Sequence, residues 1–172
     1  MSKITAVKIG GSFFNDKAVK KIKNITSIIE QISSGKSQEK FLLITGGGSA
    51  ADLVREFDSA ADLDNKSAHF AAIAAMELNA YLLSDFFEDF SFCSADTFLG
   101  ENNQLNDNNI NIFLPLEYYR RLDPLPHSWQ VSSDSIALEL AYRVGAASLI
   151  LMKQRGYRSV DKRDAFNKDS GT

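Results

Sequence analysis

The stretch FLLITGGGSAAD, which runs from Phe41 to Asp52, decides the fold of this chain. Its apolar residues end at three consecutive glycines, Gly46, Gly47 and Gly48. An apolar run that is closed by glycine and followed by helix-starting residues predicts a buried strand, a tight turn and a helix N-terminus. An ordinary turn of this kind needs one or two glycines, so three in a row favour a loop at which a phosphate or carboxylate approaches the backbone.

A second glycine turn lies near the N-terminus. Residues 4–9 (ITAVKI) predict a strand, and Gly10, Gly11 and Ser12 follow it. Loops at the carboxyl ends of parallel strands converge on one crevice, so we expect the two turns to face one ligand site. Lys8 comes just before the glycines, where a lysine is either solvated or neutralises charge during phosphoryl transfer.

The composition limits the class of protein. With 172 residues the chain is expected to form one domain of ordinary size, and a formal net charge of −3 does not favour nucleic acid or an anionic membrane as a partner. Its one cysteine, Cys93, cannot form an internal disulfide or a cysteine metal cluster, and we expect it to be buried and unreactive. No apolar run approaches the roughly 18 residues that cross a bilayer, and no signal peptide is recognisable, so we expect a cytoplasmic location.

Strand-like and helical patterns alternate along the chain. Helices are expected over residues 16–34, 50–57, 67–86, 117–122 and 132–145, and short strands over 90–93, 110–114 and 147–152. This alternation predicts an α/β fold, a three-layer α/β/α sandwich with a mostly parallel central sheet over residues 1–153. Residues 100–111, rich in asparagine, predict a mobile loop, and the charged residues 154–172 predict a solvated polar tail.

One long apolar helix and two ring-bearing side chains have more than one interpretation. The helix over residues 67–86 is apolar around much of its circumference, so we expect it to be buried on more than one side, for example at the interface of a homo-oligomer. His69 lies on this helix and is interpreted as a packing or hydrogen-bonding histidine, with a substrate contact as the alternative. Trp129 follows a proline-rich stretch and either joins the core or lines an aromatic pocket.

Three motifs occur in an informative order along the chain. They are VKIGGS at residues 7–12, ITGGG at 44–48, and SDSIA at 133–137 followed by LIL at 149–151. Together they resemble the amino acid kinase superfamily, which includes acetylglutamate, aspartate and uridylate kinases. Within it, LPHSW at 125–129, His69 and AMELN at 75–79 look most like the branch that phosphorylates an aminomethylfuran-methyl phosphate in methanofuran biosynthesis.

The resemblance implies an ATP-dependent phosphotransferase, which moves the γ-phosphoryl group of ATP to a phosphate or carboxylate oxygen. It implies that Lys8 stabilises the moving phosphoryl group and that Asp134 orients the lysines. It further implies ATP contacts at Gly10, Gly11, Ser12, Ser133 and Lys153, and contacts with a small-molecule phosphate acceptor at Gly46, Gly47, Gly48, His69 and Trp129. Mg²⁺ would be held mostly by the ATP phosphates and water, so no residue is assigned as a metal ligand.

The end of the chain departs from the family pattern. Family members usually continue beyond the equivalent of Met152, often with a Val-Asp-Gly loop, whereas Lys153-Gln154-Arg155-Gly156 stands at that position here. We therefore expect a fold that is shortened at its C-terminus. Two alternatives to the phosphate kinase stay open. One is a non-catalytic anion-binding or assembly subunit, and the other is a kinase of another acceptor, such as a nucleoside monophosphate or an acyl carboxylate.

Overall fold

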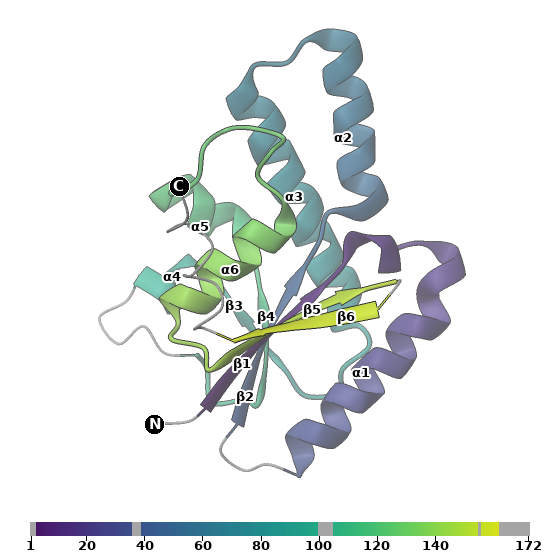
Figure 1. Cartoon of the computed structure of the whole chain (residues 1–172), viewed down its shortest axis with the longest axis vertical. Helices are drawn as coiled ribbons and strands as arrows, with labels where there is room; N and C mark the ends of the chain where they lie inside the picture. The colour runs from purple at the N-terminus through teal and green to yellow at the C-terminus, as the bar shows by residue number, and fades with distance from the viewer. Residues whose placement is uncertain (1–2, 36–38, 100–104, 155, 162–172) are drawn as a thin grey trace, which may run out of the picture.

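The computed structural model describes residues 3–35, 39–99, 105–154 and 156–161, the last of these as backbone only. One sheet has the strand order β3-β4-β2-β1-β5-β6, and helices lie on both of its faces (Figure 1). The strands are β1 (Lys3–Ile9), β2 (Glu39–Thr45), β3 (Ser91–Cys93), β4 (Ile110–Phe113), β5 (Ser148–Lys153) and β6 (Gly156–Asp161). The helices are α1 (Val19–Ser34), α2 (Gly48–Ala61), α3 (Asn65–Ser84), α4 (Ala95–Leu99), α5 (Pro115–Leu122) and α6 (Ser133–Arg143), with short 3-10 helices η1 (Gly11–Phe13) and η2 (Asp16–Ala18). Strands β1 to β5 run parallel, so the predicted three-layer architecture with a mostly parallel sheet is confirmed.

The central strands β1 and β2 are buried because helices cover both sides of the sheet. Successive side chains of a strand point to opposite faces. Accordingly, Leu42 and Ile44 pack in one cluster with α5 and α6, whereas Leu43 packs in a second cluster with α1. Helix α3 contributes to both clusters. Both clusters meet one face of α3, whereas Leu78, Tyr81 and Leu82 on its other face are about half exposed, so burial on more than one side is not seen within this chain.

The helices next to the glycine turns begin in different ways. Helix α6 begins as predicted, because Ser132 Oγ accepts a hydrogen bond from Ser135 N at 3.2 Å. Helix α2 has no side-chain cap at its start, and Ser49 Oγ instead donates to the carbonyl oxygen of Phe14 at 3.4 Å. The backbone N–H groups in the first turn of α2 are thus left without a capping side chain.

The prediction of a solvated tail over residues 154–172 is wrong for its first part. Residues Gly156–Asp161 form β6, which pairs antiparallel with β5 and places Lys153 opposite Gly156. A strand at the edge of a sheet offers a row of unpaired backbone groups, so a polar segment can pair with it without a large apolar surface of its own. Residues 162–172 lie outside the described residues.

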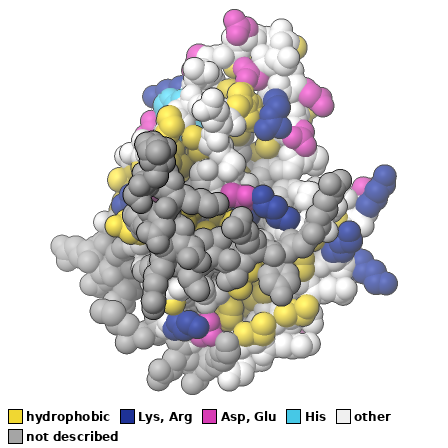
Figure 2. Space-filling model, in the orientation of Figure 1, with side chains coloured by type: hydrophobic (Ala, Val, Ile, Leu, Met, Phe, Trp, Pro, Cys, Tyr) yellow, Lys and Arg dark blue, Asp and Glu magenta, His cyan; other side chains and the backbone are white. Residues whose placement is uncertain are grey.

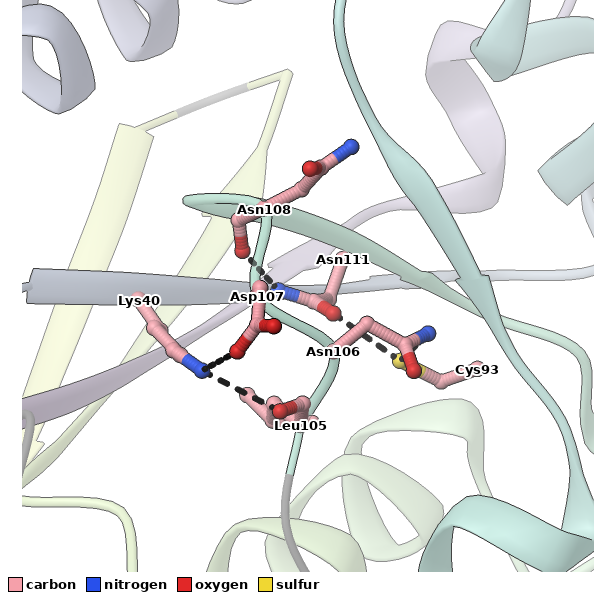
Figure 3. A network of polar contacts seen from close by, with 7 residues as sticks. All are labelled: Lys40, Cys93, Leu105, Asn106, Asp107, Asn108 and Asn111. Atoms are coloured by element: carbon pink, nitrogen blue, oxygen red, sulfur yellow. Dashed lines mark hydrogen bonds and ion pairs between the residues drawn. The ribbon is translucent and has the colours of Figure 1, made fainter.

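The predicted loop over residues 100–111 is described from Leu105 onward, where it is anchored by side chains (Figure 3). Lys40 Nζ donates to the carbonyl oxygen of Leu105 at 3.1 Å, and Asn111 Nδ2 donates to that of Asn108 at 2.7 Å. Cys93 lies in the same network, with its Sγ 3.4 Å from Asn111 Oδ1. Cys93 is fully buried, as expected, and burial raises the pKa of its thiol to about 12. Residues 100–104 lie outside the described part of the chain.

Charged side chains of both signs are mixed on the face shown in Figure 2. The described side chains there form no broad surface of a single sign. None of the helices in the described ranges combines the length and the apolar composition that a bilayer-crossing helix needs.

Candidate functional site

The two glycine turns pack directly against each other at the carboxyl ends of β1 and β2. An ideal Cβ on Gly11 would lie 2.2 Å from Gly48 N, and one on Gly48 would lie 2.3 Å from Gly11 O. Gly48 also has a φ of +55°, a conformation that residues with a side chain rarely adopt. Contact between the two turns therefore requires glycine at both positions, a reason that the sequence motif alone does not reveal.

Two backbone amides of these turns are already used inside the fold. Gly10 N donates to Met152 O at 2.9 Å, and Gly46 N donates to Ile9 O at 2.8 Å. These contacts correct the expected ligand contacts through the N–H groups of Gly10, toward ATP, and of Gly46, toward the acceptor, because both groups donate to neighbouring strands instead. An ideal Cβ on Gly10 would lie 2.9 Å from Met152 O, so this glycine too is needed for close packing.

Asn79 on α3 orients the second turn, a role that the sequence analysis did not identify. The buried Asn79 Nδ2 donates to Gly46 O at 2.6 Å and to Gly47 O at 2.9 Å. In a planar trans peptide the N–H and C=O groups point in opposite directions. The N–H groups of Gly47 and Gly48 therefore point away from Asn79, and they belong to the unpaired amides at the start of α2.

A cluster of two lysines and one aspartate lies beside the turns. Lys8 Nζ is 2.8 Å from Asp134 Oδ1, and Lys153 Nζ is 2.5 Å from Asp134 Oδ2. Strands β1 and β5 are adjacent, so Lys8 and Lys153 come from the same edge of the sheet, and Asp134 comes from the first turn of α6. Lys8 is only 4% exposed, which rules out the simple solvated lysine that the sequence left open.

The charges of this cluster favour an anion. Burial raises the pKa of Asp134, but hydrogen bonds and charges from Lys153 and Lys8 outweigh burial and hold it below its usual value of 3.8. The carboxylate is therefore ionised, and two ammonium groups against one carboxylate leave one excess positive charge. Asp134 Oδ1 is buried and has no hydrogen bond of good geometry, so its contact with Lys8 is an ion pair. Asp134 thus holds both lysines in place.

A cavity of about 550 Å³ opens next to this cluster. Among the residues predicted to bind ligands, seven line it: Gly11, Ser12, Gly47, Gly48, His69, Trp129 and Ser133. The other five, Lys8, Gly10, Gly46, Asp134 and Lys153, do not line it. They adjoin it through their neighbours, since Ser133 precedes Asp134, and Gln154, which follows Lys153, lines the cavity and donates to Ser12 O at 2.6 Å.

Helix α2 and the segment before α6 form one wall of the cavity, which the sequence analysis missed. The Arg55 guanidinium lies 4.6 Å from the ring centroid of Trp129 and 2.8 Å from Asp52 Oδ1. Trp129 Nε1 donates to Asp58 Oδ2 at 2.6 Å. Trp129 is 36% exposed and therefore lies at the cavity rim and not in the core. Arg55 is the single arginine or lysine among the described residues that line the cavity.

His69, on the first turns of α3, also lines the cavity. It is 7% exposed, and its Nε2 has no hydrogen-bond partner within the described part of the chain. Burial lowers its pKa, His127 lowers it further, and Asp123 acts in the other direction. The two histidine rings are 4.9 Å apart between centroids. The resemblance implied a substrate contact for His69, but no sequence pattern predicted that its ring would lie against that of His127.

The family of the chain follows from a comparison with known proteins. A sequence model described as the amino acid kinase family matches residues 3–155, which include both glycine turns and all three members of the Lys8, Asp134 and Lys153 cluster. The chain belongs to the amino acid kinase family. This agrees with the family that the three sequence motifs resemble.

Individual relatives share this fold over part of their length. The chain is 28% identical over 148 residues to [5-(aminomethyl)furan-3-yl]methyl phosphate kinase of Methanocaldococcus jannaschii, covering 84% of this chain and 63% of that protein. Its structure resembles uridylate kinase from Archaeoglobus fulgidus, with a TM-score of 0.67 and 18% identity over 89% of this chain and 64% of that one. It also resembles UMP kinase from Ureaplasma parvum, with a TM-score of 0.58 and 18% identity over 86% of this chain and 65% of that one. The chain thus spans slightly less than two thirds of the length of these relatives.

Proposed function

We propose that the protein is an ATP-dependent kinase that transfers a phosphoryl group to a small-molecule phosphate. The acceptor is an aminomethylfuran-methyl phosphate, and the product is its diphosphate. The observation that carries the proposal is the convergence of Lys8 and Lys153 on Asp134, at the edge where the two glycine turns meet.

The reaction needs charge stabilisation more than it needs a base. The bond between the β,γ-bridging oxygen and the γ-phosphorus of ATP breaks, and a bond from an acceptor phosphate oxygen to that phosphorus forms, so that ADP leaves. The acceptor oxygen is already ionised near neutral pH. Lys8 and Lys153 would spread positive charge over the moving group, and the ionised Asp134 would hold their ammonium groups in place.

The residues present fit the phosphates of ATP. The positively charged cluster adjoins the cavity through Ser133 and Gln154, which are chain neighbours of Asp134 and Lys153, and α2 begins with amides that no side chain caps. Magnesium would supply positive charge that offsets the charge of the phosphates. Both oxygens of Asp134 lie against lysines, so we expect phosphates and water to supply most of the ligands of this ion.

The cavity wall fits an acceptor that carries a phosphate, a flat ring and an amine. The amides of Gly47 and Gly48 and the Arg55 guanidinium suit the phosphate, and the exposed ring of Trp129 suits a flat aromatic group. Asp52 also lines the cavity and, besides its ion pair with Arg55, adds negative charge that suits an ammonium group. The name of the Methanocaldococcus jannaschii relative describes a substrate with all three features, which supports this acceptor.

A product assay tests the proposal. The full chain is incubated with Mg²⁺, γ-labelled ATP and one of three acceptors: the aminomethylfuran-methyl phosphate, UMP or N-acetylglutamate. We expect label in the furan diphosphate and at least about tenfold less in the other products. Transfer to UMP instead would assign a different acceptor. Binding of the furan phosphate without any loss of ATP would favour the non-catalytic subunit and contradict the kinase.

We also infer that the protein forms a homo-oligomer through α3. Leu78, Tyr81 and Leu82 on this helix are each about half exposed, although the opposite side of the helix is buried. Light scattering on the purified chain measures the mass directly. We expect at least a dimer, and a Leu82→Glu variant should shift the mass toward the monomer, whereas a monomeric wild type would contradict the inference.

A further inference from the structure

Both histidines of the chain meet in space beside the cavity. The sequence contains two histidines, His69 and His127. His69 lies on α3, and His127 lies in the segment between α5 and α6. Asp123, which directly follows α5, completes the cluster. The sequence analysis assigned no metal ligand, and no spacing in the sequence joins these three residues.

The geometry brings three potential ligand atoms close together. One ligand atom from each of His69, Asp123 and His127 lies within 4.8 Å of the other two. His127 Nε2 is 2.8 Å from both carboxylate oxygens of Asp123. In a tetrahedral zinc site with metal–nitrogen bonds of about 2.0–2.1 Å, neighbouring ligand atoms are about 3.3 Å apart. Closing the cluster around an ion therefore takes a movement of about 1.5 Å or less, which side-chain rotation supplies.

A buried nitrogen without a partner needs an explanation. The exposed fraction of His69 is 7%, so the residue is 93% buried. No described group makes a hydrogen bond to its Nε2. A buried polar atom without a partner costs free energy, and such atoms are uncommon in folded proteins.

We propose that His69, Asp123 and His127 bind a divalent transition-metal ion of the zinc class. Two imidazoles and one carboxylate are ligands that zinc accepts, whereas magnesium prefers oxygen ligands. The site is separate from the ion that accompanies ATP, because none of the three residues belongs to the Lys8, Asp134 and Lys153 cluster. The proposal does not depend on the kinase activity.

The ion would join the segment between α5 and α6 to α3. The segment from Asp123 to Ser132 presents Trp129 at the cavity rim and ends at the cap of α6, which carries Asp134. A metal shared by His69 and His127 would tie this segment to α3 and so hold the cavity wall in place. The expected consequence is a more stable wall, detectable without any assay of catalysis.

Zinc alone is the probe for the test. The full chain, freed of any histidine tag and of metal, is titrated with Zn²⁺ by calorimetry and melted with and without Zn²⁺. We expect one Zn²⁺ per chain and a higher Tm. Co²⁺ then serves as a spectroscopic probe of ligand type. Because the sequence has two histidines and Cys93 is buried, a signal from imidazole ligands must come from this site.

Variants separate the metal site from a simple ion pair between His127 and Asp123. His69→Gln and His127→Gln should each weaken Zn²⁺ binding by more than the about 10- to 100-fold that loss of an outer-shell partner costs. Asp123→Asn, at a more exposed position, keeps the test valid if a histidine variant folds poorly. Asp16→Asn, an exposed carboxylate with no part in the cluster, is the matched control and should bind as the wild type does. No zinc binding by the wild type, or equal binding by the wild type and both histidine variants, would overturn the proposal.

Discussion

Two parts of the site differ in construction. One is the edge formed by the carboxyl ends of β1 and β5, where Lys8 and Lys153 meet Asp134, and the other is the cavity wall that carries Arg55 and Trp129. At the edge, strand pairing and glycine contacts fix the backbone, and Lys8 is buried. At the wall, exposed side chains meet each other across two segments that have no backbone pairing. The comparison teaches that the lysines proposed for phosphoryl transfer are positioned by paired backbone, whereas Arg55 and Trp129, proposed for the acceptor, are positioned by side-chain contacts. The edge should therefore govern kcat, and the wall should govern the KM of the acceptor.

The largest effect is expected at the edge. Lys8→Met removes one of two ammonium groups and keeps much of the side-chain volume. We expect kcat to fall by at least about 100-fold. Loss of one group that stabilises the charge developing in a transition state typically has an effect of this size. Lys20→Met changes an exposed lysine on α1 and should leave kcat unchanged. An unchanged kcat in Lys8→Met would remove this residue from the reaction.

A second test concerns the contact between the glycine turns. Gly48→Ala should lower the free energy of unfolding by about 2 kcal/mol or more, because a Cβ would meet Gly11 O at 2.3 Å and φ is +55°. Gly145 is the matched control, since its φ is +65° but no heavy atom lies within 4 Å of an added Cβ. Gly145→Ala should cost about 1 kcal/mol. Equal losses for the two variants in urea unfolding would show that crowding between the turns is unimportant.

The cavity wall should respond through substrate affinity. We expect Arg55→Met to raise the KM of the acceptor by about tenfold, the effect of losing a hydrogen bond to a charged group. The KM of ATP and kcat should change little. Arg121→Met, an exposed arginine that pairs with Asp96 and Glu117 away from the cavity, is the control. A fall in kcat as large as that of Lys8→Met would erase the distinction between wall and edge.

The smallest effect concerns acid stability. The pKa of Asp134 is lower in the folded protein than its usual 3.8, so the unfolded chain binds this proton more readily. The stabilisation is fully present above the unfolded pKa and is lost as pH falls through the folded pKa. Between about pH 5 and pH 2, Asp134→Asn should therefore lose less stability than the wild type. Urea unfolding at each pH measures the free energy of unfolding. An equal loss of this free energy in both proteins would contradict the assigned direction of the Asp134 pKa.

The sequence predicted what depends on local pattern. The strands, the glycine turns and the Ser132 cap of α6 follow from short-range rules, and the resemblance placed Lys8 near Asp134. The sequence pattern did not predict β6, because that strand forms through backbone pairing along the edge of the sheet and not through side-chain hydrophobicity.

Contacts between distant segments could not be predicted. Arg55 and Trp129 meet only because α2 and the segment before α6 fold against the same cavity. His69 and His127 are joined by the packing of α3 against the end of α5, and Asn79 finds the glycine turn only in the folded chain. No local periodicity or motif encodes any of these distances.

Calorimetric titration of the full chain with Mg²⁺ and ATP tests most directly whether the edge binds a nucleotide. We predict one ATP per chain, with binding weakened in Lys153→Met and unchanged in Lys17→Met, which alters an exposed lysine. The absence of ATP binding in the wild type, with the acceptor phosphate still bound in the cavity, would contradict the account.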